Sequence, residues 1–487
     1  MPQQVPTDFL TPGTFHIFNF LRAAGALVNF PLTVALVGMK TAAGTAVVGQ
    51  IYDATDADTT DALGGQSSEG ALMARQAYAV QQFLGGGPAV KITFIVEPGG
   101  GIANTQTITF VGTATADGNQ IFKIAGRVFV VGIHNQDAPN TIAANAAAEF
   151  NKKAAELPVS ISVAANVVTL LHPHKGVNGK DVKVSCDQQV AGCVATVATT
   201  VVGTGAADAQ PALDALANKR YDGIVLANHA AADITEINSD ILTRWAPQSK
   251  TWGFYFLFEP GTIGTATPLA TAANHQSVII SNMEGCLNAP GEGAVTSAIL
   301  VFSRAQANAG YDKAVVPLYP PAEAIIYTPG EINTAIHAGL TVYTSVLDAA
   351  GNIITNRAKC EQMVTSRTTN AANNPDDSTR DIAVPRVGIT LALQLDAAKA
   401  AIDANAPAGI GAKDSRRLLR ILGAGILRAE ATATPPVIDP DKVEEDISAM
   451  VINPDGTVLG RNNVKIQYHP LTPDHQTVWS HDIIVGP

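Results

Sequence analysis

The chain has 487 residues and carries 31 Lys and Arg against 42 Asp and Glu, which gives a formal net charge of −11. Charged residues make up 15% of it, where an average soluble protein has about 25%, while 46% is hydrophobic and only 6% is aromatic. This composition excludes intrinsic disorder, which needs low hydrophobicity and high charge, and it excludes a nucleic-acid binder, which needs a basic surface.

Neither a membrane span nor a secretion signal is expected. The most apolar stretch, residues 21–39, is interrupted by Arg22, Asn29 and Pro31, whereas a span needs about 20 uninterrupted apolar residues. The first 14 residues lack the basic and apolar regions of a signal peptide. We therefore expect a soluble protein made in the cytosol, whose low charge reflects either large cores or surface covered in an assembly.

Residues 1–25 are predicted to form an extended arm without membrane insertion. Pro2, Pro6 and Pro12 disfavour a helix, and the run 15–21 that follows is aromatic and strand-like. Such a segment can pair with the sheet edge of another chain, although a disordered terminus is the alternative. The side chains that we expect in this pairing are Phe15, Ile17, Phe18 and Phe20.

Residues 26–88 are predicted to form the first part of an α/β core. The run 31–38 is typical of a buried strand, and apolar residues at i, i+4 and i+8 predict a helix over 69–84. The polar stretch 55–68 lies between them. We interpret Asp53, Asp56, Asp58 and Asp61 as a solvated acidic loop, because the Gly and Glu of a calcium loop are missing.

The sequence pattern changes over residues 89–205, where short expected strands rich in Thr, Val and Ile recur. They surround one Ala-rich helix at 141–157, and together they indicate an inserted β-rich module. The expected strands are 91–96, 106–111, 120–124, 127–133, 159–163, 167–171 and 180–186.

Residues 206–330 alternate helix and strand, as in a middle α/β domain. The expected helices are 211–219, 234–245 and 295–309, and the expected strands are 223–227, 252–258 and 278–281. The next domain, residues 331–460, begins with a helix to residue 338 and a strand at 341–346, and has helical stretches over 382–429.

A basic stripe is expected on one of these last helices. Its spacing of i, i+3, i+4 and i+7 favours a docking surface for an acidic partner, and a plain amphipathic helix with a solvated face is the alternative. The stripe comprises Lys413, Arg416, Arg417 and Arg420.

Residues 461–487 hold two strand-like runs, at 464–468 and 477–485, and are predicted to form a second extended arm. The side chains expected to take part in strand pairing are Val464, Ile466, Tyr468, Val478, Ile483 and Ile484.

No catalytic, cofactor-binding or metal-binding constellation is found in the sequence. It has no phosphate-binding loop and no nucleophile elbow, and the pair His172 and His174 is interpreted as solvated loop histidines without a third ligand. Four cysteines show no C-x-x-C spacing, so reduced and mostly buried thiols are expected. The alternative is an inter-subunit disulfide, for which Cys186 and Cys193 are the candidates.

Several motifs resemble the contractile tail sheath family of Mu-like tailed phages. The most specific is the stretch 363–381, with Asn370, Pro375, Asp376 and Ser378, although Arg367 stands where an aromatic is common. Similar motifs in the family's order are 32–45, 65–75, 110–127, 217–225, 330–341 and 348–357.

The resemblance implies an α+β, multidomain structural protein and no enzymatic activity. Family sheaths stack as rings of six subunits around an inner tube, and their extended terminal arms donate strands to neighbouring subunits. The implied partners are therefore further copies of the chain, the inner tail tube protein, and baseplate and tail terminator proteins, with no nucleic acid and no cofactor. The implied location is the virion tail, assembled in the host cytoplasm.

Two alternatives remain at this point. The first is the sheath of a phage-derived machine such as a bacteriocin or a secretion apparatus. The second is a β-modular surface adhesin or an enzyme, but an adhesin would need a secretion signal and an enzyme would need converging catalytic residues.

Overall fold

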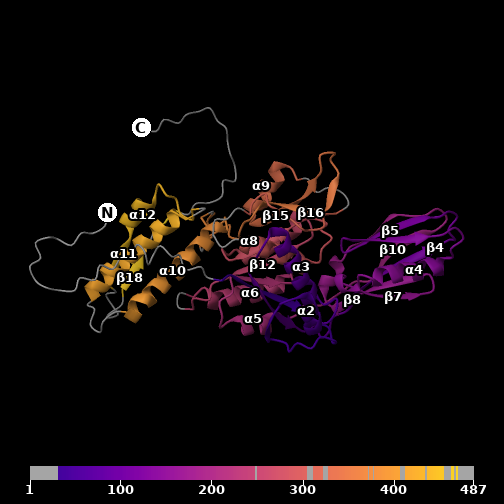
Figure 1. Cartoon of the computed structure of the whole chain (residues 1–487), viewed down its shortest axis with the longest axis horizontal. Helices are drawn as coiled ribbons and strands as arrows, with labels where there is room; N and C mark the ends of the chain where they lie inside the picture. Colours follow the sequence, from indigo (N-terminus) through magenta and orange to yellow (C-terminus); the bar gives the residue numbers. More distant parts are fainter. Residues whose placement is uncertain are drawn as a thin grey trace, which may run out of the picture. The chain divides into compact units, whose positions relative to one another are not determined.

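The structure is a computed structural model. Its description covers residues 31–246, 249–303, 311–321, 327–370, 372–376, 378–405, 412–433, 436–454, 462–465 and 468–469. The chain forms two compact units, of which the larger contains the described residues from Pro31 to Pro385 and the smaller those from Arg386 onward. The fold is mixed α and β with several sheets (Figure 1).

The larger unit is built on a nine-stranded sheet with the order β14-β16-β15-β13-β12-β11-β1-β3-β2. The strands from β15 to β3 run parallel, while β2, β16 and β14 pair antiparallel at the two ends. We expected the residues of β3 in the inserted module, but they pair with β1 in this sheet. The strands are β1 (Thr33–Met39), β2 (Ile51–Asp53), β3 (Ala89–Ile95), β11 (Gly223–Leu226), β12 (Phe254–Glu259), β13 (Val278–Asn282), β14 (Val315–Val316), β15 (Leu340–Leu347) and β16 (Ile353–Gln362).

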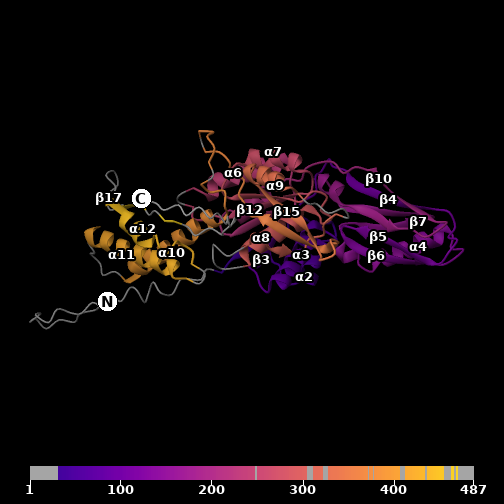
Figure 2. The same cartoon turned by 90° about the horizontal axis from the view of Figure 1, so that it is seen from above.

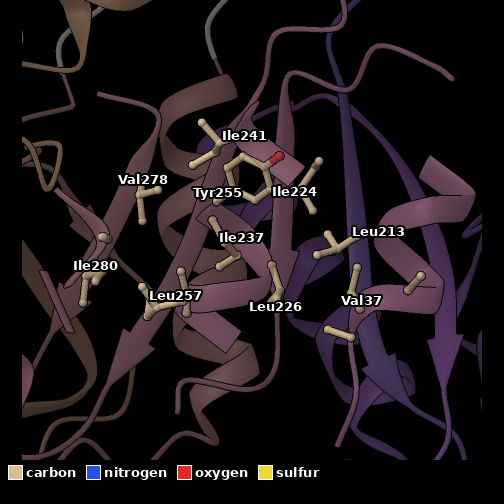
Figure 3. Close-up of a cluster of buried hydrophobic side chains, with 14 of the residues drawn as sticks. Val37, Leu213, Ile224, Leu226, Ile237, Ile241, Tyr255, Leu257, Val278 and Ile280 are labelled. Carbon is tan, nitrogen blue, oxygen red and sulfur yellow. The ribbon is translucent and has the colours of Figure 1, made fainter. Parts of the chain in front are cut away.

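Helices cover both faces of this sheet, as expected when crossovers join parallel strands. On one face, aliphatic side chains of α5, α6 and α7 pack on those of β1, β11, β12 and β13, among them Leu213, Ile237 and Leu257 (Figure 3). The helices of the unit are α2 (Ala57–Gly64), α3 (Glu69–Leu84), α5 (Gln210–Leu216), α6 (Ala231–Arg244), α7 (Ile263–Ala273), α8 (Pro290–Phe302) and α9 (Pro329–His337).

Helix α8 packs on the opposite face and is buried along its whole length. Its first turn contains a short glycine-rich run, Gly291-Glu292-Gly293. A Cβ on Gly293 would lie 2.4 Å from the Phe258 ring, so only glycine lets α8 approach β12 this closely. The run is therefore a helix-packing feature and not a phosphate-binding loop.

Residues 103–201 form two smaller sheets around α4, and we call this part the 103–201 module (Figure 2). One sheet has the order β10-β4-β8-β7 and the other β6-β5-β9, and Phe110, Phe122, Phe129 and Phe150 pack edge to face between them. Its elements are β4 (Ala103–Val111), β5 (Gly118–Ile124), β6 (Arg127–Ile133), α4 (Pro139–Asn151), η1 (Ala154–Glu156), β7 (Ser160–Ala164), β8 (Val167–Lys175), η2 (Val177–Asp181), β9 (Val184–Gln188) and β10 (Val194–Val201).

The acidic stretch that we interpreted as a solvated loop contains the helix α2, so that interpretation was wrong. Asp56 caps this helix, because its Oδ1 accepts a hydrogen bond of 2.7 Å from the Thr59 backbone N–H. Asp61 forms an ion pair with Arg75 of α3, and Asp53 forms one with Lys91 of β3. Asp56 thus stabilises the start of α2, and Asp61 holds α2 against α3.

The smaller unit contains α10 (Ala383–Asn405), α11 (Ala412–Ala431), α12 (Val443–Ala449) and the antiparallel pair β17 (Val451–Pro454) and β18 (Asn462–Lys465). Val387 and Leu391 of α10 pack against Ile426 and Leu427 of α11 in its core. Across the described residues, no helix is both long and apolar enough to span a bilayer.

Candidate assembly surfaces

Most of the residues predicted to donate strands lie outside the described residues: Phe15, Ile17, Phe18, Phe20, Ile466, Val478, Ile483 and Ile484. Val464 lies in β18, opposite Ile452 of β17. Tyr468 is half-buried against the core of the smaller unit, where burial raises its pKa. In the described part of that unit, β17 and β18 form a ribbon of two strands, and such a ribbon leaves two edges on which further strands can pair.

The predicted basic stripe lies on α11. Lys413, Arg416 and Arg417 are in its first two turns, and Arg420 is exposed one turn later. Of the two apolar residues that follow the stripe, Ile421 is 43% exposed and Leu422 is buried.

The two cysteines that are the candidates for the alternative, an inter-subunit disulfide, differ in accessibility. Cys193 is fully buried in the core of the 103–201 module, and Cys186 on β9 is partly exposed. Burial raises the pKa of Cys186 to about 11, which disfavours the reactive thiolate. Of the pair, only Cys186 is therefore placed to meet another subunit, and it is a slow nucleophile.

This difference predicts the thiol reactivity of the folded chain. With Ellman's reagent at pH 8, we expect Cys186 to react slowly and Cys193, Cys286 and Cys360 to react only after unfolding, because burial raises the pKa of all three and keeps the reagent out. In the control variant Cys186→Ser, the slow reaction of the folded chain with the reagent should disappear. Rapid labelling of Cys193 in the folded protein would contradict the expectation.

The histidine pair was wrongly interpreted as a solvated loop. His172 and His174 lie in β8 and are 4% and 1% exposed, and burial lowers the pKa of His174 to about 3. The Nε2 of His174 accepts a hydrogen bond of 3.1 Å from the backbone N–H of Glu69. Over the part of the chain that the structure describes, no three His, Cys, Asp or Glu side chains are arranged to hold a metal ion.

A buried polar cluster joins the 103–201 module to the core sheet, and the sequence analysis missed it. Asn178 of η2 donates from Nδ2 to Oε1 of Glu69 at 2.9 Å and to Oδ1 of Asn228 at 2.8 Å. The Nε2 of His229 lies 3.3 Å from Oδ2 of Asp181. We call these five residues the junction cluster.

The charges of the junction cluster are coupled. Burial alone would lower the pKa of His229, but the nearby carboxylate of Asp181 outweighs it and raises that pKa. Glu259 at the end of β12 is a second carboxylate near His229, with 3.7 Å between Oε2 and Nε2. Asn228 and Glu259 lie at the carboxyl ends of neighbouring parallel strands, a position that the strand pattern could have indicated.

A second contact of the module is a buried ion pair between Arg127 of β6 and Glu292 of α8. The distances are 2.6 Å from Nη2 to Oε1 and 3.3 Å from Nη1 to Oε2, and the two side chains are 10% and 1% exposed. The guanidinium also lies over the ring of Tyr319 at 5.4 Å. The module is thus held to the core by buried polar contacts.

Comparisons with known proteins give one curated relative and several solved structures. The Mu-like prophage FluMu tail sheath protein of Haemophilus influenzae is 23% identical over 353 residues, which cover 70% of each chain. Sheath tail proteins from Listeria innocua and Desulfitobacterium hafniense have solved structures with TM-scores of 0.44 and 0.45 and identities of 15% and 14%. The alignments cover 90% of this chain in both cases, and 90% and 96% of the two structures. No protein-family profile matches the sequence.

The relative from Haemophilus influenzae covers more than two thirds of the chain, and its name agrees with the family that the sequence motifs resemble. The resemblance is thereby confirmed: over 70% of its length the chain is similar to a tail sheath protein of a Mu-like prophage, which is a structural protein and not an enzyme.

Proposed function

We propose that this chain is the sheath subunit of a contractile tail. It polymerises as stacked rings of six subunits around an inner tube, and it contracts from a metastable extended state to drive the tube through the host envelope. The observation that carries the proposal is the similarity to a tail sheath protein over 70% of the chain. The sequence composition supports it, because a chain with 15% charged residues has much surface that an assembly can cover.

The arms at residues 1–25 and 461–487 are proposed to donate strands to neighbouring subunits. Strand addition satisfies the backbone groups of a sheet edge without requiring charge. The ribbon of β17 and β18 offers such edges in the described part of the smaller unit. The arms then act as hinges when the subunits move as rigid bodies during contraction.

The inserted module, which the structure limits to residues 103–201, is proposed to face outward, and the domain predicted at residues 331–460 is proposed to contact the tube. Further partners in the virion tail are the baseplate and tail terminator proteins. Assembly takes place in the cytoplasm of the host.

Negative-stain microscopy of the purified full chain tests this function. Striated tubes that lengthen with protein concentration would support it. A chain that stays monomeric at high concentration, with and without the inner tube protein, would contradict it.

Charge reversal on α11 tests the docking of the tube. Arg416→Glu combined with Arg417→Glu is expected to reduce co-sedimentation of the sheath with preformed tubes at least tenfold, because four positive charges become two positive and two negative. Lys442→Glu, an exposed cation near α12, is the matched control and should leave sedimentation unchanged. Equal loading of both variants would show that this helix does not dock the tube.

A further inference from the structure

The sheet β10-β4-β8-β7 of the 103–201 module carries almost no charge. Lys175, the last residue of β8, is the one charged residue in its four strands. The face turned away from the core is lined mainly by Thr, Ser, Ala and Val, with Leu171 and Pro173 of β8, and Val111 and Val194 on it are 58% and 53% exposed. Charged residues are depleted in the cores of interfaces, so this surface has the composition of a contact and not of a solvated face.

One margin of this sheet is the strand β10, which is open along its second half. The side chain of Gln189 covers its first half, because Oε1 accepts from the Ala195 N–H at 3.1 Å and Nε2 donates to the Ala195 carbonyl at 3.3 Å. Since backbone groups alternate in direction along an antiparallel strand, those of Val197 and Thr199 also point outward. No described strand pairs with them, and all residues from Ala198 to Val201 are exposed.

The strand β10 also lacks the features that usually protect an edge. It contains no Pro and no charged residue, although a bulge at Thr200 interrupts the end of the open stretch 197–201. Such an edge is a template for pairing with another strand.

The opposite margin of the sheet is β7, which also has no described strand on its outer side. Its five residues, Ser160–Ala164, are uncharged, and four of them are exposed. The length of β7 matches the open stretch 197–201 of β10.

The directions of the two margins are complementary. Each strand of the sheet runs antiparallel to its neighbour, so in a four-stranded sheet the first and last strands run in opposite directions. A second copy in the same orientation therefore brings its β10 antiparallel to β7 of the first. This contact joins two different surfaces, so it can repeat from copy to copy as an array requires.

Charge favours a second copy of this chain as the occupant. Two chains with a net charge of −11 repel each other wherever their charged surfaces meet. The sheet face and its two edges carry almost no charge. Two copies can therefore approach there without electrostatic repulsion and without burying charged side chains.

From these observations we infer that β10 of one subunit pairs with β7 of the next, so that the outer modules form a continuous sheet along the assembly. The inference rests on the proposed self-assembly and adds a contact that does not involve the terminal arms.

The experiment is cross-linking of the assembled full chain in a Cys186→Ser background. The double variant Ser162→Cys with Ala198→Cys places one thiol on each margin of the sheet. The two margins lie three strand spacings apart within one chain, about 14 Å, which is too far for a disulfide. Oxidation or a short bismaleimide should therefore give a ladder of oligomers only through contacts between copies.

Each single variant is the matched control and should remain monomeric on a denaturing gel. Cross-linked dimers in a single variant would overturn the inference, because they require β7 to meet β7 or β10 to meet β10. Tubes that form without a ladder in the double variant would also overturn it, while leaving the proposed function intact. If the parent chain formed no tubes, the proposed function and the inference would both fail.

A second variant tests the pairing itself. Thr199→Pro removes an outward N–H that makes no hydrogen bond within the sheet, so the fold can be kept while the edge is blocked. We expect it to reduce the ladder at least fivefold, whereas Thr199→Val should keep it. A full ladder with Thr199→Pro would exclude backbone pairing through β10.

Discussion

Arg127→Met is expected to lower the free energy of unfolding by about 3 to 5 kcal/mol, the usual cost of removing one partner of a buried ion pair. The substitution leaves the carboxylate of Glu292 without its cation at 1% exposure. Burial works against the charge of Arg127, but the charge and hydrogen bonds of Glu292 outweigh it and raise the pKa of the guanidinium. Urea unfolding of the full chain measures the loss.

The carboxylate of Glu292 has a second role that a matched variant can separate. Its Oε2 accepts from the backbone N–H of Ala289 at 2.9 Å, which caps the start of α8. Glu292→Gln keeps an acceptor for this cap and removes the charge. The double variant Arg127→Met with Glu292→Gln should therefore be more stable than Arg127→Met alone.

An exposed pair provides the control for these variants. Lys152 and Glu149 form an ion pair on α4 with side chains 67% and 33% exposed, and such pairs contribute about 0.5 kcal/mol or less. If Arg127→Met cost no more than Lys152→Met, the pair with Glu292 would not hold the module to the core. Hydrogen exchange should locate the effect of Arg127→Met in β5 and β6.

The sequence predicted best those elements whose signal is local. The helix α3 was predicted at its observed limits because its apolar spacing is regular, Ser68 caps it and Gly85 ends it in the left-handed region. The strand β6 was also predicted at its limits. In both elements, the residues next to the ends mark where the element begins and stops.

Elements with a weak local signal were missed. The helix α7 contains Pro268 and four residues of Thr or Gly, and its first turn is stabilised by the side chain of Thr262, which accepts from the Thr265 N–H. The strands β10 and β16 were missed because Ala, Thr and charged residues break the apolar alternation. Their place is fixed by pairing with β4 and β15, which no local pattern contains.

Buried contacts between distant segments could not be predicted from the sequence either. Arg127 and Glu292 are 165 positions apart, and Asn178 and Glu69 are 109 apart. Each residue has the ordinary appearance of a surface polar residue in its own segment. Only the folded sheet brings them together, and the same holds for the burial of His172 and His174.

The junction cluster predicts that stability depends on pH through Glu69. Burial raises the pKa of this carboxyl from its ordinary 4.5 to about 7, against the hydrogen bond from Asn178 and the charge of His229, while Asp233 raises it further. The folded state therefore binds a proton between pH 4.5 and 7 that the unfolded state releases. The stabilisation is complete below pH 4.5 and is lost as pH rises through 7.

Glu69→Gln is expected to remove this dependence. The rise from 4.5 to about 7 corresponds to about 3 kcal/mol, so the variant should gain up to that amount on the parent chain between pH 5 and pH 8. The side-chain oxygen of the glutamine still accepts the hydrogen bond from Asn178. Buried His174 has an opposite effect on the pH dependence of stability, but it is present in both chains and cancels in the comparison. Urea midpoints at the two pH values measure the difference.

The matched control is Glu149→Gln on the outer side of α4, where no comparable gain is expected. Parallel pH profiles of the parent chain and Glu69→Gln would contradict the assignment. If the profiles diverge as expected, ionisation of a single buried carboxyl at the start of α3 destabilises the folded chain, although the hydrogen bond from Asn178 of η2 favours the charged form. The free energy of unfolding would then fall above neutral pH, because a negative charge forms at a buried site whose hydrogen bonds do not fully replace its solvation by water.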